Sequence, residues 1–312
     1  MVNMDAISSA IDLVRKNLPE VECRLDEPLR GHTSFKIGGP VRAMFFPKSV
    51  KEFTELYGVL HKNGVRPFIM GNGTNLLADD STMDLVVIKT TGLNGIELTD
   101  DAEITALCGA SLSKLAMFAC ERGFSGLEFA HGIPGTLGGA VSMNAGAYGG
   151  EMANIVYKTQ AFNFDAGVFS VTGDEHGFVY RRSRFTDSND IILSSVIRLQ
   201  KGDSAEIRAR IDEMSARRRQ SQPLNLPSAG SAFKRPEGAY AAALIEEAGL
   251  KGFIIGVAAV SEKHSGFIVN LGGATFDDVV AVIDHVRETV FVRTGIMLEP
   301  EIKILRGDAS WK

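Results

Sequence analysis

The chain has 312 residues, of which 45% are hydrophobic and 23% charged, and its formal net charge is −5 at pH 7. These ordinary globular values exclude wholesale disorder, and a mildly acidic chain gives no general reason to expect nucleic acid as a partner. No apolar run approaches the ~20 residues of a membrane span, and acidic residues interrupt the N-terminal segment, which excludes a signal peptide. We therefore expect a cytoplasmic protein. The three cysteines lack metal-ligand spacing, so no metal site is expected.

The spacing of apolar side chains predicts helices and strands in alternation along the first part of the chain. Ser49 and Glu52 have the spacing of a capping box, and Asn63-Gly64 ends the helix that they open. The elements expected here are a helix over 5–18, a strand over 41–46, the helix that follows Ser49, and strands over 66–70, 85–89 and 103–107.

The remainder of the chain shows the same mixture and no internal repeat or low-complexity tract. The elements expected are a helix over 111–122, strands up to about residue 199, helices over 204–219 and 240–248, a strand over 266–270, a last helix capped by Thr275, and a strand over 301–305.

The segment 132–150 is unusually dense in glycine, and a shorter glycine segment occupies 71–77. Glycine gives up more backbone freedom on folding than any other residue, so this density indicates a backbone that turns sharply or approaches an anion. Two such segments suggest a pyrophosphate held from two sides, and hence a dinucleotide cofactor. The interleaved polar residues Ser142, Asn144 and Tyr148 favour cofactor contact over the alternative, a buried crossover with small residues for packing.

Two common nucleotide-binding motifs are absent. The Rossmann motif needs a third glycine and an amphipathic helix after Gly71-Asn72-Gly73, and the chain has neither. The phosphate-binding motif G-x-x-x-x-G-K-[ST] does not occur. From these residues alone, the expected ligand is a nucleotide or a phosphate.

Six strings carry a resemblance to a known family. They are HTSFKIGG (32–39), GNGTNLL (71–77), GIPGTLGGAVSMNAGAYG (132–149), YRRSRF (180–185), PSAGSAFK (227–234) and LEPE (298–301). In this order and at this spacing the chain resembles the UDP-N-acetylenolpyruvoylglucosamine reductases, bacterial flavoenzymes of peptidoglycan precursor synthesis, over about residues 30–305. The short interval between Arg181 and Ser231 resembles the shorter form of the family.

The resemblance implies an α+β protein with two α/β FAD-binding subdomains of the vanillyl-alcohol-oxidase type, over 1–77 and 78–200, followed by an α+β substrate-binding domain over 201–312. It implies one non-covalent FAD, with its pyrophosphate wrapped by backbone of both glycine segments. The cofactor-binding residues are then Gly71, Asn72, Gly73, Thr74, Asn75, Leu76, Gly132, Ile133, Pro134, Gly135, Thr136, Gly138, Gly139, Asn144, Ala145, Gly146 and Tyr148.

The resemblance also implies the reaction. NADPH would reduce FAD, and the enolpyruvyl group of UDP-N-acetylglucosamine enolpyruvate would then take a hydride at its methylene carbon. Arg181 matches the arginine that faces the substrate carboxylate, Glu301 the glutamate that stabilises the intermediate, and Ser231 the serine that delivers the proton. Neither nucleic acid nor a membrane is an expected partner, and the expected state is a monomer or a weak dimer.

Arg219, Lys234 and His264 are the substrate-binding residues that the resemblance implies, with Arg219 and Lys234 directed at the diphosphate. The chain departs from the family pattern at Arg235 and over 240–243, where a glycine and a lysine are missing.

Each of these residues also has an ordinary structural interpretation. Ser231 could be a turn serine that caps its own backbone, Arg181 part of a solvated basic cluster, and Glu301 an edge-strand glutamate. Arg219 and its two arginine neighbours could balance the C-terminal dipole of their helix. His264 could be a surface residue.

Two other functional classes stay open. One is an FAD oxidase of the same superfamily, in which His131, beside the larger glycine segment, is the candidate for a covalent flavin link. The other is a non-catalytic nucleotide-binding regulator, against which the intact Arg181, Ser231 and Glu301 argue.

Overall fold

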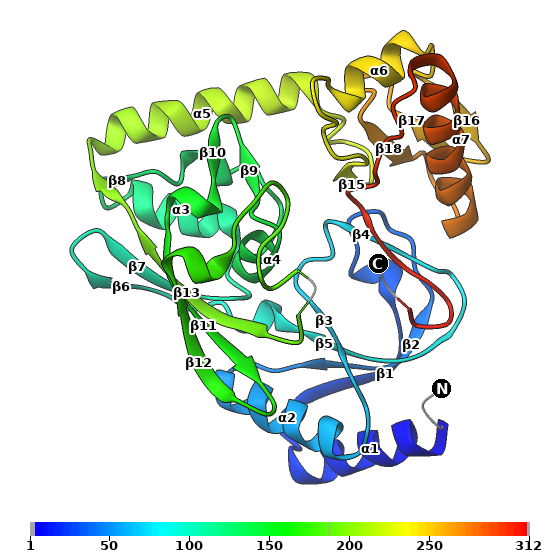
Figure 1. Cartoon of the computed structure of the whole chain (residues 1–312). Coiled ribbons are helices and arrows are strands. Elements are labelled where there is room, and N and C mark those ends of the chain that lie inside the picture. The colour runs from blue at the N-terminus through cyan, green and yellow to red at the C-terminus, as the bar shows by residue number, and fades with distance from the viewer. Residues whose placement is uncertain (1–3, 187, 311–312) are drawn as a thin grey trace. The chain divides into compact units, whose positions relative to one another are not determined.

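The computed structural model describes residues 4–186 and 188–310 and divides into two compact units (Figure 1). The first unit contains the chain up to Arg24, Ala43–Asn72 and Val86–Arg218. The second contains Leu25–Arg42, Gly73–Leu85 and the chain from Arg219 onward. Each unit is therefore built from separated stretches of sequence. The three consecutive domains expected from the sequence stay a prediction.

The helices are α1 (Met4–Asn17), α2 (Val50–Lys62), α3 (Leu112–Cys120), α4 (Leu137–Ser142), α5 (Ser204–Ser221), α6 (Ala241–Glu247) and α7 (Phe276–Thr294). The strands are β1 (Glu22–Pro28), β2 (Pro40–Phe46), β3 (Phe68–Met70), β4 (Leu76–Ala78), β5 (Met83–Lys89), β6 (Ile96–Asp100), β7 (Glu103–Leu107), β8 (Phe124–Ser125), β9 (Gly146–Ala147), β10 (Gly150–Glu151), β11 (Val156–Asn163), β12 (Gly167–Thr172), β13 (Ile191–Arg198), β14 (Gln200–Lys201), β15 (Ser228–Ser231), β16 (Ile254–Ile255), β17 (Ala258–Val260), β18 (Phe267–Asn270) and β19 (Lys303–Leu305).

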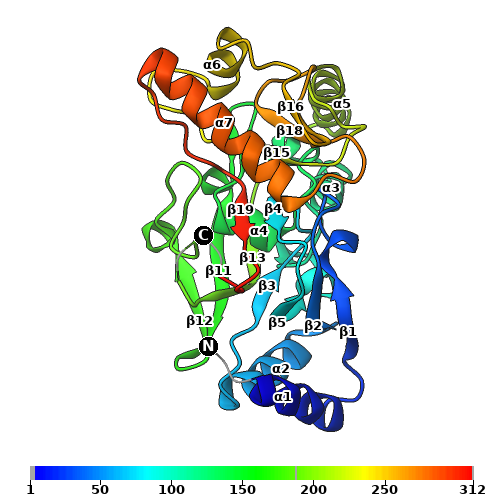
Figure 2. The same ribbon diagram turned by 90° about the vertical axis from the view of Figure 1, so that its right-hand side faces the viewer.

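Helices α1 and α2 lie side by side in the first unit (Figures 1 and 2). Ser49 caps α2 as expected, because its side chain accepts a hydrogen bond from the Glu52 N–H at 3.1 Å. The reciprocal half of a capping box differs from expectation: the Glu52 carboxylate accepts from the Lys48 N–H at 2.8 Å. Strands β1, β2, β5 and β3 form a sheet in that order, in which β3 and β5 are parallel.

A five-stranded sheet of the first unit is antiparallel, with the order β12-β11-β13-β7-β6. Phe162 on β11 is buried and meets the rings of Phe53 and Tyr57 on α2 edge-on, with centroids 6.4 and 5.5 Å apart. These aromatic contacts join the sheet to α2 and form part of one large apolar core. The unit thus offers a rigid base for the loops that β11, β13 and α4 carry.

The second unit has a four-stranded antiparallel sheet, β15-β18-β17-β16, against which α7 packs (Figure 2). Thr275 caps α7 through a complete capping box with Asp278, and Gly295 ends the helix in the left-handed conformation at φ +73°. Val279, Ile283 and other apolar residues of α7 are buried in the core of this unit, as their helical spacing predicts. Strand β19 pairs in parallel with β4.

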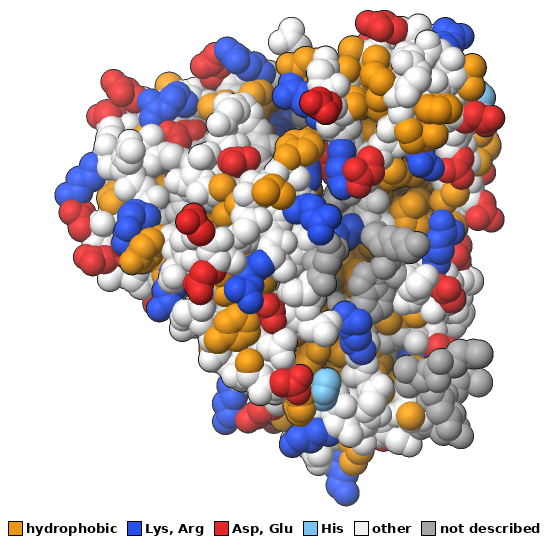
Figure 3. Space-filling view, in the orientation of Figure 1, with side chains coloured by type: hydrophobic (Ala, Val, Ile, Leu, Met, Phe, Trp, Pro, Cys, Tyr) orange, Lys and Arg blue, Asp and Glu red, His pale blue; other side chains and the backbone are white. Residues whose placement is uncertain are grey.

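The expected elements are confirmed within a few residues of their predicted ends, and so is the mixed fold of helices and strands. Several short elements were missed, among them β1, β6 and β15–β17. Helix α4 lies inside the glycine-rich segment, and β4 occupies 76–78, which the sequence analysis placed in a loop. Among the residues described, no helix is long and apolar enough to cross a membrane. On the face shown in Figure 3, basic and acidic side chains are interspersed rather than gathered by sign.

Candidate active site

The two glycine segments meet within the first unit. Gly71 lies so close to Thr136 that a Cβ added at Gly71 would overlap the Thr136 hydroxyl. The next residue, Asn72, donates its side-chain amide to the Pro134 carbonyl at 2.8 Å. The approach of the two segments explains why residue 71 is glycine, and it places the start of the short segment against the middle of the long one.

The long segment is partly helical, and the protein uses some of its glycines for packing. The Gly138 N–H donates to the Cys108 carbonyl at 2.8 Å, and a Cβ at Gly138 would lie 3.0 Å from Cys108 Cβ. Cys108 is buried, and burial raises the pKa of its thiol to about 12. Gly139, by contrast, is exposed, with only the Thr136 hydroxyl near its missing Cβ, at 3.7 Å. Gly138 therefore supports α4, whereas Gly139 faces outward.

Asn144 and Tyr148 both have left-handed backbone, with φ values of +44° and +53°. Such residues are uncommon outside glycine and mark a tightly constrained turn. The Asn144 side chain is used within the protein, since it donates to the Val179 carbonyl at 3.1 Å and accepts from the Ala153 N–H at 2.9 Å. Tyr148 is exposed. Ile133, Gly135, Ala145 and Gly146, also expected to bind cofactor, lie in the same segment around these turns.

Arg218, at the end of α5 within the first unit, lies against this segment. Its guanidinium donates to the Gly132 carbonyl and lies 5.8 Å from the centre of the Tyr148 ring. Its Nε is buried and has no hydrogen-bond partner among the described residues. A buried unsatisfied donor beside exposed backbone and small side chains suits an anionic group, so these residues fit a phosphate-bearing cofactor. The run of three arginines was the signal, but the sequence analysis selected the neighbouring Arg219.

The rest of the short glycine segment belongs to the second unit. Gly73 has φ +62°, and its carbonyl accepts from the Ser34 N–H at 3.1 Å. The Ser34 hydroxyl also donates to the Ser228 carbonyl at 2.6 Å, so this residue ties the glycine turn to β15. The sequence analysis quoted the 32–39 string but gave Ser34 no role. Thr74 and Leu76 follow in the turn and at the start of β4.

Ser231 and Glu301 lie close together in the second unit. Ser231 ends β15, and the Glu301 N–H donates to the carbonyl of the next residue, Ala232, at 2.8 Å. The Glu301 carbonyl in turn accepts from the Asn75 side-chain amide at 3.0 Å. One hydrogen-bonded frame therefore holds the serine, the glutamate and the short glycine segment.

The surroundings of Ser231 do not match a turn serine. The residue is paired with Phe267 of β18, and its hydroxyl makes no hydrogen bond to any residue within 4–186 and 188–310. A hydroxyl that is not used by its own backbone can act on a ligand. The ordinary interpretation of Ser231 is therefore disfavoured.

The three expected substrate-binding residues differ in their surroundings. The Lys234 ammonium is ion-paired with the Glu299 carboxylate, which partly offsets its charge. His264 accepts a hydrogen bond from the Gly266 N–H at its Nδ1, 3.1 Å away, so that Nε2 carries the proton in the neutral ring. Burial lowers the pKa of His264, which favours this neutral form. Arg219 is exposed at the end of α5.

Arg181 is placed by a loop of the first unit. It has left-handed backbone at φ +56°, inside a narrow turn closed by two hydrogen bonds between Val179 and Arg182, of 3.0 and 3.2 Å. Its guanidinium lies 5.1 Å from the centre of the Tyr180 ring. The turn therefore holds the Arg181 backbone in a sparsely populated conformation, and the role of its side chain stays a prediction.

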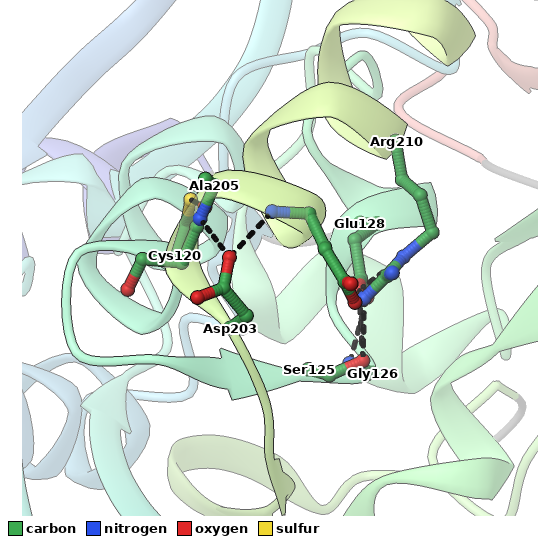
Figure 4. Close-up of polar contacts among 9 residues, drawn as sticks. Cys120, Ser125, Gly126, Glu128, Asp203, Ala205 and Arg210 are labelled. Carbon is green, nitrogen blue, oxygen red and sulfur yellow. Dashed lines mark hydrogen bonds and ion pairs between the residues drawn. The ribbon is translucent and has the colours of Figure 1, made fainter.

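A polar network that the sequence analysis missed lies just before the long glycine segment (Figure 4). Glu128 is buried and accepts hydrogen bonds from Arg210 of α5 at 2.8 Å, from the Ser125 hydroxyl at 2.8 Å and from the Gly126 N–H at 2.6 Å. Burial alone would raise the pKa of Glu128, but these hydrogen bonds outweigh it and lower the pKa. Three residues after Glu128, the His131 ring meets the Ser215 hydroxyl at 3.2 Å. Helix α5 is thus fastened to the chain that leads into the glycine segment.

Comparisons with known proteins identify the families that the two parts of the chain match. Residues 41–168 match the FAD-binding domain family, and residues 222–305 match the C-terminal domain of UDP-N-acetylenolpyruvoylglucosamine reductase. The UDP-N-acetylenolpyruvoylglucosamine reductase of Caldanaerobacter subterraneus subsp. tengcongensis is 45% identical over 95% of this chain and 97% of its own length. That of Limosilactobacillus reuteri is 43% identical over 92% of this chain and 96% of its own. The chain belongs to the UDP-N-acetylenolpyruvoylglucosamine reductase family.

A solved structure of this family confirms the fold. The reductase of Thermus caldophilus superposes with a TM-score of 0.77 at 33% identity, covering 91% of this chain and 98% of that one. The FAD-binding match contains both glycine segments, and the reductase C-terminal match contains Ser231, Lys234, His264 and Glu301. Arg181 and Arg219 lie outside both matched ranges.

Proposed function

We propose that the protein reduces UDP-N-acetylglucosamine enolpyruvate to UDP-N-acetylmuramate in the cytoplasm, with NADPH as reductant and FAD as bound cofactor. The observation that carries the proposal is the frame that joins Ser231, Glu301 and the short glycine segment within a chain of this family. The two residues that the reaction needs for charge and proton are held together by backbone hydrogen bonds, and the serine hydroxyl is available.

The residues that would hold FAD are those of the two glycine segments, from Gly71 to Leu76 and from Gly132 to Tyr148. Exposed backbone, small side chains and the unsatisfied Nε of Arg218 favour contact with the phosphates. When bound, FAD would supply the relay of a hydride from NADPH to the enolpyruvyl methylene carbon.

Arg181 would bind the substrate carboxylate. A guanidinium offers two parallel donors that match the two carboxylate oxygens, and its fixed charge stabilises the negative charge that builds there when the double bond is reduced. The closed turn that carries Arg181 limits the movement of its backbone, so that this geometry exists before the substrate arrives.

Glu301 and Ser231 would supply the hydrogen bond and the proton that the reduction needs. Glu301, protonated or acting through a water molecule, donates a hydrogen bond to the enolate-like group, because an ionised carboxylate would repel it. Ser231 delivers its hydroxyl proton to the carbon next to the carboxylate, and the resulting alkoxide regains a proton from solvent. One hydride and one proton then saturate the double bond.

Arg219 would contact the diphosphate of the substrate from the exposed end of α5. Arg219→Ala is expected to raise KM for the sugar nucleotide while leaving the reduction of the cofactor by NADPH almost unchanged. An unchanged KM would mean that Arg219 only balances the dipole at the C-terminal end of its helix.

The proposal is tested on the purified protein. It should be yellow, lose its flavin absorbance when NADPH is added without oxygen, and regain it when the enolpyruvyl substrate follows. Bleaching without recovery would overturn the assigned substrate. Acid precipitation separates the oxidase alternative, since flavin that stays on the precipitated chain would reveal a covalent link.

A further inference from the structure

His176 is a buried imidazole for which the proposed reaction has no use. Only 1% of its surface is exposed. Its Nδ1 lies 3.0 Å from the Gly173 carbonyl and its Nε2 lies 2.9 Å from the Thr159 hydroxyl. A carbonyl oxygen can only accept, so Nδ1 carries the proton and Nε2 accepts from Thr159. The structure therefore fixes one neutral tautomer.

This residue touches both arms of the loop that carries Arg181. It ends the short helix Gly173–His176, from which the chain runs outward to the turn. Its carbonyl accepts from the Arg184 N–H on the returning arm at 2.8 Å. Its ring stacks on Phe178 of the outgoing arm, with centroids 4.9 Å apart, and meets Phe185 of the returning arm edge-on at 6.3 Å.

The Thr159 bond fixes the loop to the sheet of the first unit. Thr159 lies on β11, is fully buried, and its hydroxyl is also 3.0 Å from the Ser195 hydroxyl on β13. The chain of hydrogen bonds thus runs from two central strands through His176 to the Gly173 carbonyl. A phenyl ring at position 176 would keep the stacking but would leave that carbonyl without its partner.

The far end of the same loop is held by the long glycine segment. The Ser142 carbonyl accepts from the hydroxyls of Ser183 and Thr186, at 2.8 and 2.7 Å. Between these two anchor points stands Arg181, whose left-handed backbone is costly unless its surroundings impose it.

We propose that His176 is a positioning residue for Arg181: its neutral ring joins both arms of the 173–186 loop to β11 and so holds the arginine ready for the substrate carboxylate. This inference rests on the proposed function of Arg181. Such a role explains why a titratable ring is buried where no reacting atom is expected.

The anchor should weaken in acid. Burial lowers the pKa of His176, and the charged groups that act on it are Glu175, which raises the pKa, and Arg184, which lowers it. In an opened loop the imidazole regains its ordinary pKa of about 6.5. Between this ordinary pKa and the lowered pKa of the closed loop, His176 is protonated in the open form and neutral in the closed form. Lowering the pH through this range therefore favours opening of the loop.

The test compares His176→Phe with His176→Asn, whose amide can still reach the Gly173 carbonyl. Amide hydrogen exchange over residues 173–186 of the flavin-loaded enzyme should be about tenfold faster in the Phe variant, with Asn intermediate. The acid dependence of exchange, corrected for intrinsic rates, should be lost in both variants. His61→Phe is the matched control, because His61 stacks on Phe164 elsewhere in the unit and should leave the loop unchanged.

Kinetics complete the test. His176→Phe should raise KM for the enolpyruvyl substrate several-fold and leave reduction of the flavin by NADPH unchanged. Wild-type exchange rates in His176→Phe, or an acid dependence that persists in it, would overturn the positioning role. The variant Arg181→Lys separates the two proposals. If this variant reacts with substrate like wild type, the function assigned to Arg181 is wrong, but amide exchange in the 173–186 loop still tests the role of His176.

Discussion

The Ser231–Glu301 frame and the Arg181 loop hold their functional side chains in different ways. In the frame, the chain is held mainly by backbone hydrogen bonds between β15, β18 and the residues before β19. In the loop, side chains do most of the holding: Asn144, Ser183 and Thr186 each bond to backbone of another stretch, and His176 bonds to the Thr159 hydroxyl on β11. A frame of backbone bonds tolerates changes of neighbouring side chains, whereas a loop held by a few side chains is sensitive to each of them.

The largest effect should come from chemistry within the frame. Ser231→Ala should slow reaction of the reduced enzyme with substrate by about 10²–10⁴-fold, the range for a positioned acid or base, because no hydroxyl is left to deliver the proton. The melting temperature should stay near that of wild type, since the serine hydroxyl has no partner within the described residues. Rapid-mixing kinetics of the two half-reactions provide the measurement. Equal slowing of both half-reactions would mean that Ser231 has a structural role instead.

A second large effect should follow from Gly138, which is packed rather than exposed. Gly138→Val should strip the flavin, because its branched side chain would collide with Cys108 and displace α4. Gly58→Ala, on α2, is the control and should keep its flavin, since the added methyl meets no atom within 4 Å. The ratio of flavin to protein absorbance measures the flavin content of both variants. A Gly138→Val protein with full flavin would show that α4 does not shape the cofactor site.

A moderate effect is expected where the loop is held by hydroxyls. Removing both donors to the Ser142 carbonyl, with Ser183→Ala and Thr186→Val, should raise KM for the enolpyruvyl substrate about tenfold, because Arg181 loses its fixed position. The matched change in the frame is Ser34→Ala, which removes one hydroxyl bond and should alter KM less than twofold. Steady-state kinetics measure KM for both variants. A larger rise of KM in Ser34→Ala would show that the frame, rather than the loop, is the more sensitive to loss of a side-chain hydrogen bond.

Breaking the Glu128–Arg210 pair should have the smallest effect on turnover. Glu128→Gln should lower the free energy of unfolding at pH 7 by about 1.5–3 kcal/mol, the range for hydrogen bonds to a charged group. Because the pKa of Glu128 is lowered in the folded protein, its contribution is present above the ordinary glutamate pKa and is lost as pH falls through the folded value. Urea unfolding at several pH values should show wild type and variant converging in acid. A difference in the free energy of unfolding that does not change with pH would mean that the ionised carboxylate of Glu128 is not its cause.

Local patterns were enough to predict most elements, because each is encoded by its own residues. Helix α7 has its capping residue, its apolar stripe and its terminal glycine within twenty-one consecutive positions, from Thr275 to Gly295. Strand β4 could not be predicted in this way, since its three residues become a strand only through pairing with β19, more than two hundred residues later. Helix α4 was missed because its glycines disfavour a helix locally, and the packing on Cys108 that explains Gly138 appears only in the folded protein.

The candidate site was predictable to a similar degree. Ser231 and Glu301 were selected because they match family strings, and the structure brings them together. The roles of Ser34, Glu128 and His176 could not be predicted, because their partners are distant in sequence and a single serine, glutamate or histidine is not distinctive by itself. Asn144 was selected as a cofactor residue; its side chain bonds to protein backbone at both ends, and its contact with the cofactor stays a prediction.

The parallel pair of β4 and β19 has a consequence for synthesis of the chain. All stretches of the first unit have been translated once residue 218 is made, whereas β4 must wait for residues 303–305, close to the C-terminus. A protein grows from the ribosome at about 5–20 residues per second, so β4 spends on the order of ten seconds or more without its partner strand. An unpaired strand edge is a surface on which chains aggregate, so the nascent second unit is exposed to aggregation until β19 has been made.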